Sequence, residues 1–376
     1  MPSSRARSVR ATTSTVLPGR LLACLAQVPD PGHRRGVRYP LVGLLAVAVG
    51  AVLAGARSFA AVGQWAGALT SDDLASLGLR GAPEKSQVRK LFARLDAAAL
   101  DLALACYAWT CVRQVAGRTV IAVDGKTLRG ARSASGTAPH LVAALEHTTG
   151  AVLGQTAVPA KTNEIPAVRD LLGGFDPADL QGAVVTCDAM HTQHDTAKAV
   201  ADAGACYVFT VKGNQPGLHR RLKALPWADV PAHSTTQRGH GRQTTRTIKA
   251  VAAPAWTGFP AAAQVAQLRR TTTRAGKKTV EVVYLVTSAD HLDAPPATLA
   301  AWVQGHWGIE ALHWTRDVTY DEDRSRVRTG QAPHVMATLR NTAITILRLA
   351  GWTNIAQANR HHAYHPSESI TCLLTS

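Results

Sequence analysis

The sequence predicts an α/β protein in which a helical N-terminal region precedes a core of a mixed five-stranded sheet with helices, interrupted by a β-rich insertion. Two patterns predict this class. Apolar positions recur at helical spacing up to about residue 115, whereas from residue 116 they form short continuous runs typical of buried strands. With 376 residues, 46% of them hydrophobic and 18% charged, the chain is long enough for two or three structural units with a real core.

The N-terminal third of the chain predicts helices after a basic arm. Residues 1–17 are rich in Ser, Thr and Arg and predict a disordered arm, and residues 18–115 predict a helical domain. The uncharged run 39–56 is near the lower length limit of a membrane span or could pass for a signal peptide, but we expect a buried core helix because 38 residues precede it. The segment 82–95 could supply a DNA-reading helix, although its basic residues also suit a solvated helix face.

The order of the strands in the middle of the chain indicates the topology. Three strand-like runs are followed by a helix, a strand, a helix and a fifth strand, at 119–125, 140–147, 151–159, 164–175, 183–190, 196–204 and 206–214. This is the order of the RNase H-like fold. We assign 116–214 to the first part of that core, 215–292 to a β-rich insertion, 293–352 to the returning core helices, and 353–376 to a C-terminal tail.

Three acidic residues have settings that suggest a catalytic role. Asp124 and Asp188 end the first and fourth strand runs, and Glu310 lies in the later helical segment GHWGIEALHW, whose apolar face we expect to be buried. A carboxylate beside a buried strand is costly unless it is paired, hydrogen-bonded or bound to metal. Three such carboxylates can hold two divalent ions that activate water at a phosphodiester. Taken singly, an Asp-Gly turn or an ion pair explains each as well.

Two histidines flank the glutamate on the same predicted helix. His306 and His313 stand four residues before and three after Glu310, so the three share one helix face. Zinc binding stays open, but the spacing is not HExxH and no further ligand is evident. We expect these histidines to line the site and contact phosphate or a carboxylate, with core packing as the alternative.

The charge of the chain predicts a polyanionic partner. The net charge is +16 and the pI about 10.1, although a GC-rich genome, whose codon composition favours arginine, produces the same balance. The densest basic zone is 212–249, which suits either a phosphate-tracking surface or a solvated β-edge. The candidate DNA-contacting residues are Lys126, Arg129, His191, Lys212, Arg238, Arg242, His306, His313, Arg316 and Arg326.

The cysteines and one polar segment allow two further predictions. The six cysteines contain no CxxC pair and no regular spacing, so we expect reduced thiols and a cytoplasmic, nucleoid-associated protein. In the polar segment KTNE, Asn163 predicts a helix N-cap ahead of 164–175.

The motifs DGKTLRGAR, VTCDAMHTQ, YVFTVKGNQP and HWGIEALHWTRDVTYDEDRSRVRTGQAP resemble those of the ISAs-type DDE transposases of bacterial insertion sequences, over roughly residues 20–350. The resemblance implies an RNase H-like core and metal-ligand roles for Asp124, Asp188 and Glu310. It implies two Mg²⁺ ions, which Mn²⁺ can replace, and cleavage and strand transfer of DNA. It further implies double-stranded DNA, as element ends and target, as the partner, and a homodimer on DNA, with no membrane.

The chain departs from the wider superfamily around the glutamate. That superfamily has Tyr, Arg and Lys at positions −7, −4 and +7 from the glutamate, where this sequence has Val303, His306 and Asp317. Arg316 could supply the phosphate contact that the missing lysine would make. These departures leave open an alternative function, a DNA-binding protein with a decayed, inactive transposase core.

Overall fold

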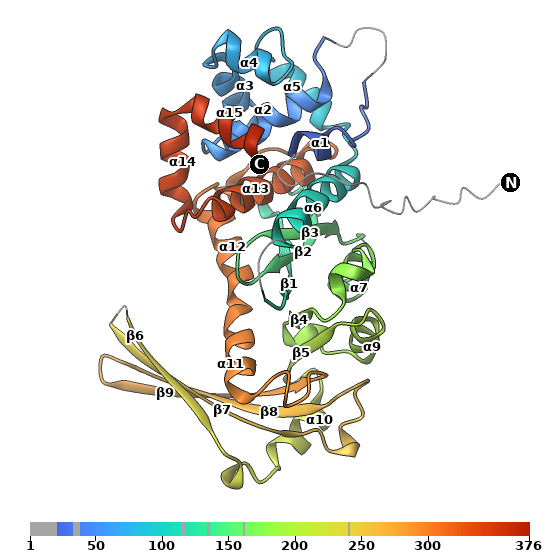
Figure 1. Cartoon of the computed structure of the whole chain (residues 1–376), viewed down its shortest axis with the longest axis vertical. Helices are drawn as coiled ribbons and strands as arrows, with labels where there is room; N and C mark the ends of the chain where they lie inside the picture. The colour runs from blue at the N-terminus through green and yellow to red at the C-terminus, as the bar shows by residue number, and fades with distance from the viewer. Residues whose placement is uncertain (1–20, 33–37, 114–116, 134–135, 161, 240) are drawn as a thin grey trace, which may run out of the picture.

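The computed structural model describes residues 21–376 apart from 33–37, 114–116, 134–135, 161 and 240. The predicted basic arm at 1–17 therefore lies outside the described residues. Figure 1 shows an elongated molecule in which helices gather at one end and a long twisted sheet extends to the other.

The helical end is built around one buried helix. The N-terminal helices are α1 (Leu21–Leu25), α2 (Leu41–Leu53), α3 (Phe59–Gly67), α4 (Ser71–Ser76), α5 (Lys85–Phe92) and α6 (Ala97–Val112). Helix α2 is buried along almost its whole length because its Ala, Gly, Val and Leu side chains pack on helices from both ends of the chain. The predicted core helix at 39–56 is confirmed. Among the described residues no single helix is long and apolar enough to cross a membrane; α5 and α6 reach that length together, but are bent by 96°.

The C-terminal segment belongs to the same helical bundle. Helix α13 (Ala332–Leu349) is followed by α14 (Ile355–Tyr364) and α15 (Pro366–Thr375), and both of these pack on α2. The predicted tail at 353–376 is therefore wrong: buried Ile355, Ala358 and His362 recur at helical spacing. The helices at 18–115 share one hydrophobic core with α13–α15 and one face of the sheet, so they do not form a separate domain.

The central sheet has the predicted strand order. Its strands are β1 (Val120–Thr127), β2 (His140–Glu146), β3 (Val152–Ala157), β4 (Val184–Cys187) and β5 (Cys206–Val211), arranged β3-β2-β1-β4-β5. Strands β1, β2 and β3 are antiparallel, whereas β1, β4 and β5 are parallel. Helices α7 (Glu164–Gly173) and α9 (His194–Asp202) cover one face, with the short α8 (Pro177–Leu180) nearby. The RNase H-like fold is confirmed.

The insertion extends this sheet. After α10 (Pro216–Lys223), strands β6 (His233–Gly239), β7 (Arg242–Ala252), β8 (Gln264–Arg274) and β9 (Lys277–Thr287) form an antiparallel meander. Because β9 pairs with β5, the described residues form one nine-stranded sheet and not a separate five-stranded one. The β-rich character predicted for 215–292 is present in the structure as β6, β7, β8 and β9.

Two consecutive helices bring the chain back from the insertion to the core. Helix α11 (Pro296–Gly305) and helix α12 (Trp307–Val318) are separated only by His306, and they run along the sheet face opposite α7 and α9 (Figure 1). Helix α11 contacts β5 and β7, and α12 contacts β1 and β2. This path carries the segment around Glu310 from the insertion to the first strand of the core.

Candidate active site

The three predicted acidic residues line one pocket. Val123 of β1 lies opposite Cys187 of β4 in a parallel pair, so Asp124, which lies within β1, and Asp188, which follows the end of β4, are on neighbouring strands about 5 Å apart. Glu310 reaches the same place from α12, and the three carboxylates line a cavity of about 270 Å³. The structure therefore brings these residues together, while their role as metal ligands stays a prediction.

The surroundings of Asp124 disfavour the negative charge of its carboxylate. Its side chain is 27% exposed, and Nδ1 of His313 lies 3.5 Å from its Oδ2. Burial raises the pKa of Asp124 to about 6, and the negative charges of Glu164 and Asp188 raise it further against the effect of a hydrogen bond from the Gly125 backbone. Among the described residues no Lys or Arg lies within ion-pair distance of this carboxylate. A bound cation would therefore stabilise the charged form.

Asp188 is more exposed than Asp124. Its Oδ1 accepts a hydrogen bond of 2.6 Å from the backbone N–H of Ala189 and lies 3.8 Å from Nζ of Lys212. Oxygen atoms of this kind are the ligands that Mg²⁺ prefers. In the described part of the chain, no three His, Cys, Asp or Glu side chains are grouped closely enough to hold a metal ion by themselves. The donor chemistry fits Mg²⁺, which commonly takes one or two carboxylates and completes its shell with water and substrate phosphate.

The helix that carries Glu310 has two tryptophan side chains that are more exposed than we expected. Ile309 and Leu312 are buried, but Trp307 and Trp314 are 45% and 62% exposed. Trp307, Glu310 and Trp314 are spaced i, i+3 and i+7, which places them on one helix face turned away from the core. The prediction of a buried apolar face around the glutamate is wrong for both tryptophans.

The two histidines of this segment have separate partners. Nδ1 of His306 lies 3.0 Å from the hydroxyl of Thr186, whereas His313 contacts Asp124. Burial lowers the pKa of His313 to about 3 and also lowers the pKa of His306, so both rings are neutral at neutral pH. The geometry does not support a zinc site formed by these histidines and Glu310. His313 contacts a carboxylate, one of the two roles predicted for it, and DNA contacts by both histidines stay predictions.

Arg316 does not face the DNA-accessible surface. It is fully buried, and its Nε lies 2.9 Å from Oε2 of Glu322. The other carboxylate oxygen of Glu322 accepts a hydrogen bond of 2.7 Å from Arg340. The predicted phosphate contact by Arg316 is therefore wrong, and Arg316 cannot replace the lysine that the superfamily has near this position.

Lys126 and His191 are also buried. Lys126 is 9% exposed, and its Nζ lies 2.7 Å from Oδ2 of Asp317. His191 has no exposed surface and lies with its Nε2 3.4 Å from Oε2 of Glu164. Both were predicted as DNA contacts, and both predictions are wrong, because their polar atoms point into the protein. Asp317 thus binds a lysine from β1 at the position where the superfamily has a lysine of its own.

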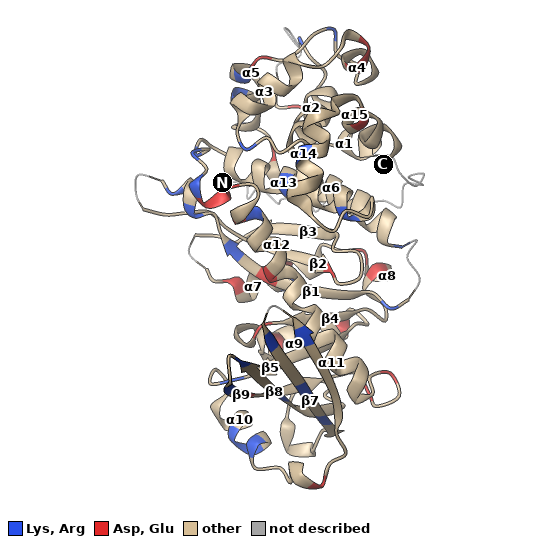
Figure 2. Cartoon of the chain, turned by 90° about the vertical axis from the view of Figure 1, so that its left-hand side faces the viewer, with Lys and Arg blue, Asp and Glu red and all other residues tan. Residues whose placement is uncertain are grey.

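The remaining basic candidates are accessible. Arg129 is 74% exposed, Lys212 lines the acidic pocket, and Arg238, Arg242 and Arg326 are exposed. Figure 2 shows lysines and arginines along the β6–β9 part of the sheet and on α10. This exposure is what a phosphate contact requires, and the DNA-binding role of these five residues stays a prediction.

One acidic residue near the site was missed from the sequence. Asn163 caps α7, as predicted, by accepting a hydrogen bond of 3.0 Å from the Ile165 N–H. The next residue, Glu164, points to β1, and its Oε1 lies 2.6 Å from Nε2 of His140. An acid in the first turn of a helix is common because of the helix dipole, so the local pattern offered no reason to single it out.

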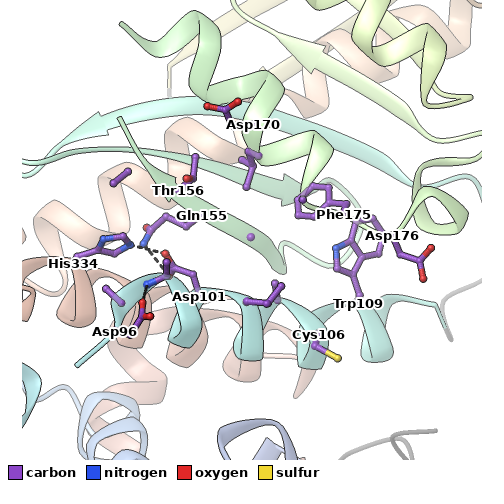
Figure 3. A pocket seen from close by; sticks show the side chains of 18 of the residues that line it. Asp96, Asp101, Cys106, Trp109, Gln155, Thr156, Asp170, Phe175, Asp176 and His334 are labelled. Carbon is purple, nitrogen blue, oxygen red and sulfur yellow. Dashed lines mark hydrogen bonds and ion pairs between the residues drawn. The ribbon is translucent and has the colours of Figure 1, made fainter. Parts of the chain in front are cut away.

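A larger cavity lies elsewhere in the described residues. It has a volume of about 690 Å³ and is bounded by α6, β3 and α7 (Figure 3). Asp101 lies on its wall and contacts His334 at 2.5 Å and Thr338 at 2.6 Å. Asp124, Asp188 and Glu310 do not line it. This cavity is separate from the acidic pocket.

Comparison with known proteins identifies relatives named as transposases. The chain is 30% identical over 347 residues to the "Putative transposase YncI" of Escherichia coli O157:H7, with 87% of each chain covered. It is 27% identical to the "H repeat-associated putative transposase YhhI" of Escherichia coli (strain K12), covering 87% of this chain and 90% of the relative. A piggyBac transposase synaptic complex with hairpin DNA matches with a TM-score of 0.41 and 12% identity, over 99% of this chain and 84% of that chain.

Family models cover most of the chain. Residues 22–108 match the model of the segment associated with this kind of transposase domain, and residues 116–346 match the model described as "Transposase DDE domain". The narrower ISAs-type assignment stays a prediction. Because the second match spans more than half of the sequence and includes all three pocket acids, this chain belongs to the transposase DDE domain family.

Proposed function

We propose that this protein is a transposase that cuts DNA at the ends of an insertion sequence and joins those ends to target DNA, using two Mg²⁺ ions that Mn²⁺ can replace. The observation that carries the proposal is the meeting of Asp124, Asp188 and Glu310 in one pocket, from segments far apart in the sequence. Family membership supports the same chemistry.

The pocket acids would share the ions. Asp124 lies between the other two elements, so it would hold one ion with Asp188 and the other with Glu310. When bound, such ions activate water for attack on a phosphodiester and stabilise the departing 3′ oxygen. The scheme needs no covalent link between protein and DNA.

The surrounding side chains would position the reactants. The neutral His313 ring lies against Asp124 and restricts the orientation of its carboxylate. The exposed Arg129, Lys212, Arg238 and Arg242 would contact phosphates and fix the register of double-stranded DNA. Two element ends must meet, so we propose a homodimer on DNA, acting in the cytoplasm at the nucleoid.

The test uses the purified full chain and DNA that carries the inverted repeats flanking its coding region. With Mg²⁺ or Mn²⁺ we expect nicks at the repeat ends and then strand-transfer products, and with EDTA neither. Asp188→Asn should bind the DNA and not cut it. Cutting by Asp188→Asn at the wild-type rate would contradict the proposed site, and salt-sensitive DNA binding without cutting by the wild type would favour the inactive DNA-binding alternative.

A further inference from the structure

The β-rich insertion contributes part of the wall of the pocket that contains Asp124, Asp188 and Glu310. Arg246 of β7 and Arg270 of β8 line this pocket together with the three acids. The pairing of β9 with β5 joins the insertion strands to the core sheet and so brings the two arginines to the site. The pocket therefore combines acids from the core with arginines from the insertion.

The register of the sheet fixes where Arg246 lies. It is directly opposite Arg270 in the antiparallel pair of β7 and β8. It also stands two residues before Ile248, which is fully buried in the hydrophobic core under α11. Because residues i and i+2 of a strand point to the same face, Arg246 points to the face of the sheet along which α11 and α12 run.

The two arginines differ in their partners. Nη2 of Arg270 lies 2.5 Å from Oε2 of Glu281, and its guanidinium lies 4.9 Å from the centroid of the Trp307 ring. Nη1 of Arg246 donates a hydrogen bond of 2.9 Å to the amide oxygen of Gln237, and no acid of the described residues lies within ion-pair distance of Arg246. The positive charge of Arg246 is therefore not balanced by a paired carboxylate.

The charges closest to Arg246 are positive. Burial lowers the pKa of Arg246, and the charges of Arg270 and Arg242 lower it further. The guanidinium still keeps its proton, because arginine is not deprotonated in proteins. Like charges directly opposite each other on two strands destabilise a sheet. A phosphate between the two arginines would relieve this repulsion and accept hydrogen bonds from both.

Other basic side chains near the three acids already have acidic partners. Arg316 and Lys126 are buried in ion pairs, as described above. Lys212 lines the pocket, but its Nζ lies 3.8 Å from Oδ1 of Asp188. In the described part of the chain, Arg246 lines the pocket without such a partner, so it is the cation best placed to bind an added anion.

We propose that Arg246 donates hydrogen bonds from two of its nitrogens to the non-bridging oxygens of the phosphate that is cut, with Arg270 as a second donor opposite it. The inference rests on the proposed function and adds a phosphate-binding residue to it. As the oxygen of water bonds to phosphorus and the bond to the 3′ oxygen breaks, Arg246 keeps its protons. Its charge stabilises the negative charge on the non-bridging oxygens.

DNA binding in EDTA tests this contact without divalent ions. The phosphate that the wild type cuts is first located on the DNA and then replaced by a neutral methylphosphonate. This replacement should weaken binding by the wild type at least about 10-fold, because hydrogen bonds between charged groups are lost. Arg246→Gln should bind unmodified DNA at least about 10-fold more weakly than the wild type, and the replacement should then weaken its binding only slightly.

The matched control is Arg269→Gln. Arg269 is exposed and directly precedes Arg270 on β8, so its side chain points to the opposite face of the sheet. This variant should lose as much affinity on methylphosphonate replacement as the wild type does. An equally large loss in Arg246→Gln would overturn the proposal.

A second variant guards against a folding defect. Arg246→Gln removes one of two opposed charges, so its thermal unfolding without DNA should occur at or above the wild-type temperature. Arg246→Lys keeps the charge but not the forked pair of donors, so it should bind unmodified DNA with an affinity between those of Arg246→Gln and the wild type. Should Arg246→Gln fail to fold, wild-type affinity in Arg246→Lys would overturn the two-nitrogen contact.

The failure of this proposal is distinguishable from failure of the proposed function. If the wild type cuts DNA with Mg²⁺ and Arg246→Gln cuts it at the same rate, the three-acid function stands and the Arg246 contact does not. If the wild type cuts no DNA, the function fails, and the contact with a cut phosphate fails with it.

Discussion

The carboxylate of Glu322 with its two arginines and the group of acids around Asp124 come from distant segments, and the chain treats them differently. Glu322 is 2% exposed and is held by Arg316 and Arg340, with charged contacts on both oxygens. Asp124 is also largely buried, but no Arg or Lys of the described residues lies within ion-pair distance of its carboxylate, and the negative charges of Glu164 and Asp188 act on it. The first group is neutralised by the fold, and we propose that a bound cation neutralises the second.

The ion pairs of Glu322 also hold the helix that carries Glu310. Arg316 lies six residues after Glu310 on α12, and its guanidinium also contacts Asn341 of α13 at 3.3 Å. Asn341 in turn donates a hydrogen bond of 2.8 Å to Gln155 of β3. The ion pairs and hydrogen bonds therefore connect α12, which carries Glu310, to α13 and to the sheet.

The largest effect on stability is expected at Glu322. Glu322→Gln leaves two buried arginines without a counter-charge and should lower the free energy of unfolding by about 3–5 kcal/mol. Urea unfolding of the full chain measures this. Glu281→Gln, which alters an exposed pair with Arg270, should change it by less than about 1 kcal/mol. An equal loss in both variants would remove the distinction between the two groups.

A substitution in the group of acids around Asp124 should have the opposite effect to Glu322→Gln, with a large change in DNA cutting and a small change in stability. Asp188→Asn should lower the rate of DNA cutting by on the order of 10³-fold, because a ligand of the ions is lost, and should leave stability nearly unchanged. Single-turnover cutting with Mg²⁺, together with urea unfolding, measures both effects. Asp195→Asn, at an exposed position on α9, is the control. A large loss of stability in Asp188→Asn would mean that this acid is structural.

The pH dependence of stability should distinguish Asp124 from an ordinary paired acid. Its folded-state pKa of about 6 lies above the ordinary value of 3.8, so its stabilising contribution is complete below 3.8 and is lost as pH rises through about 6. Without divalent ions, Asp124→Asn should therefore be more stable than the wild type at pH 8 and similar to it near pH 4. Thermal unfolding at both pH values measures the difference, and equal stabilities at pH 8 would contradict it.

The pair between Lys126 and Asp317 is intermediate between the two groups, since one partner is buried and the other about one-third exposed. A double-mutant cycle with Lys126→Met and Asp317→Asn should give a coupling energy of about 1 kcal/mol. Urea unfolding of the four proteins supplies the cycle. A coupling near zero would contradict a stabilising pair between Lys126 and Asp317.

The smallest expected effect concerns the exposed basic residues. Arg129→Ala should reduce the slope of log affinity for DNA against log salt by about 1, because one phosphate contact is lost. Lys198→Ala is the control, since Lys198 is exposed and paired with Asp202, as Arg129 is with Asp323, but lies on α9. Filter binding at several salt concentrations measures the slopes, and identical slopes for the two variants would exclude Arg129 from the interface.

Local patterns sufficed for much of the fold. The run 39–56 is apolar on every side, which only a helix buried all round can satisfy, and the strand runs around Asp124 and Asp188 are short and continuous. The C-terminal helices were missed because polar and histidine residues separate their buried positions. In the structure these buried positions pack on α2.

The candidate site was predictable where an acid stood out from its neighbours. Asp124, Asp188 and Glu310 each interrupt or follow an apolar pattern, and they do share one pocket. Glu164 follows a helix cap, where acids are common, so its closeness to β1 could not be inferred. The basic residues were the least predictable, because the sequence does not show that Arg316 has a buried acid six residues later as its partner.

The sequence by itself determined the class of fold, the strand order and which three acids are candidates, because hydrophobic periodicity and interrupted apolar runs are local properties of the chain. Only the tertiary structure decided which charges are neutralised. The side chains of Lys126, His191 and Arg316 carry the same functional groups as exposed basic residues. They are buried beside acids from α12, α7 and the turn after α12, respectively.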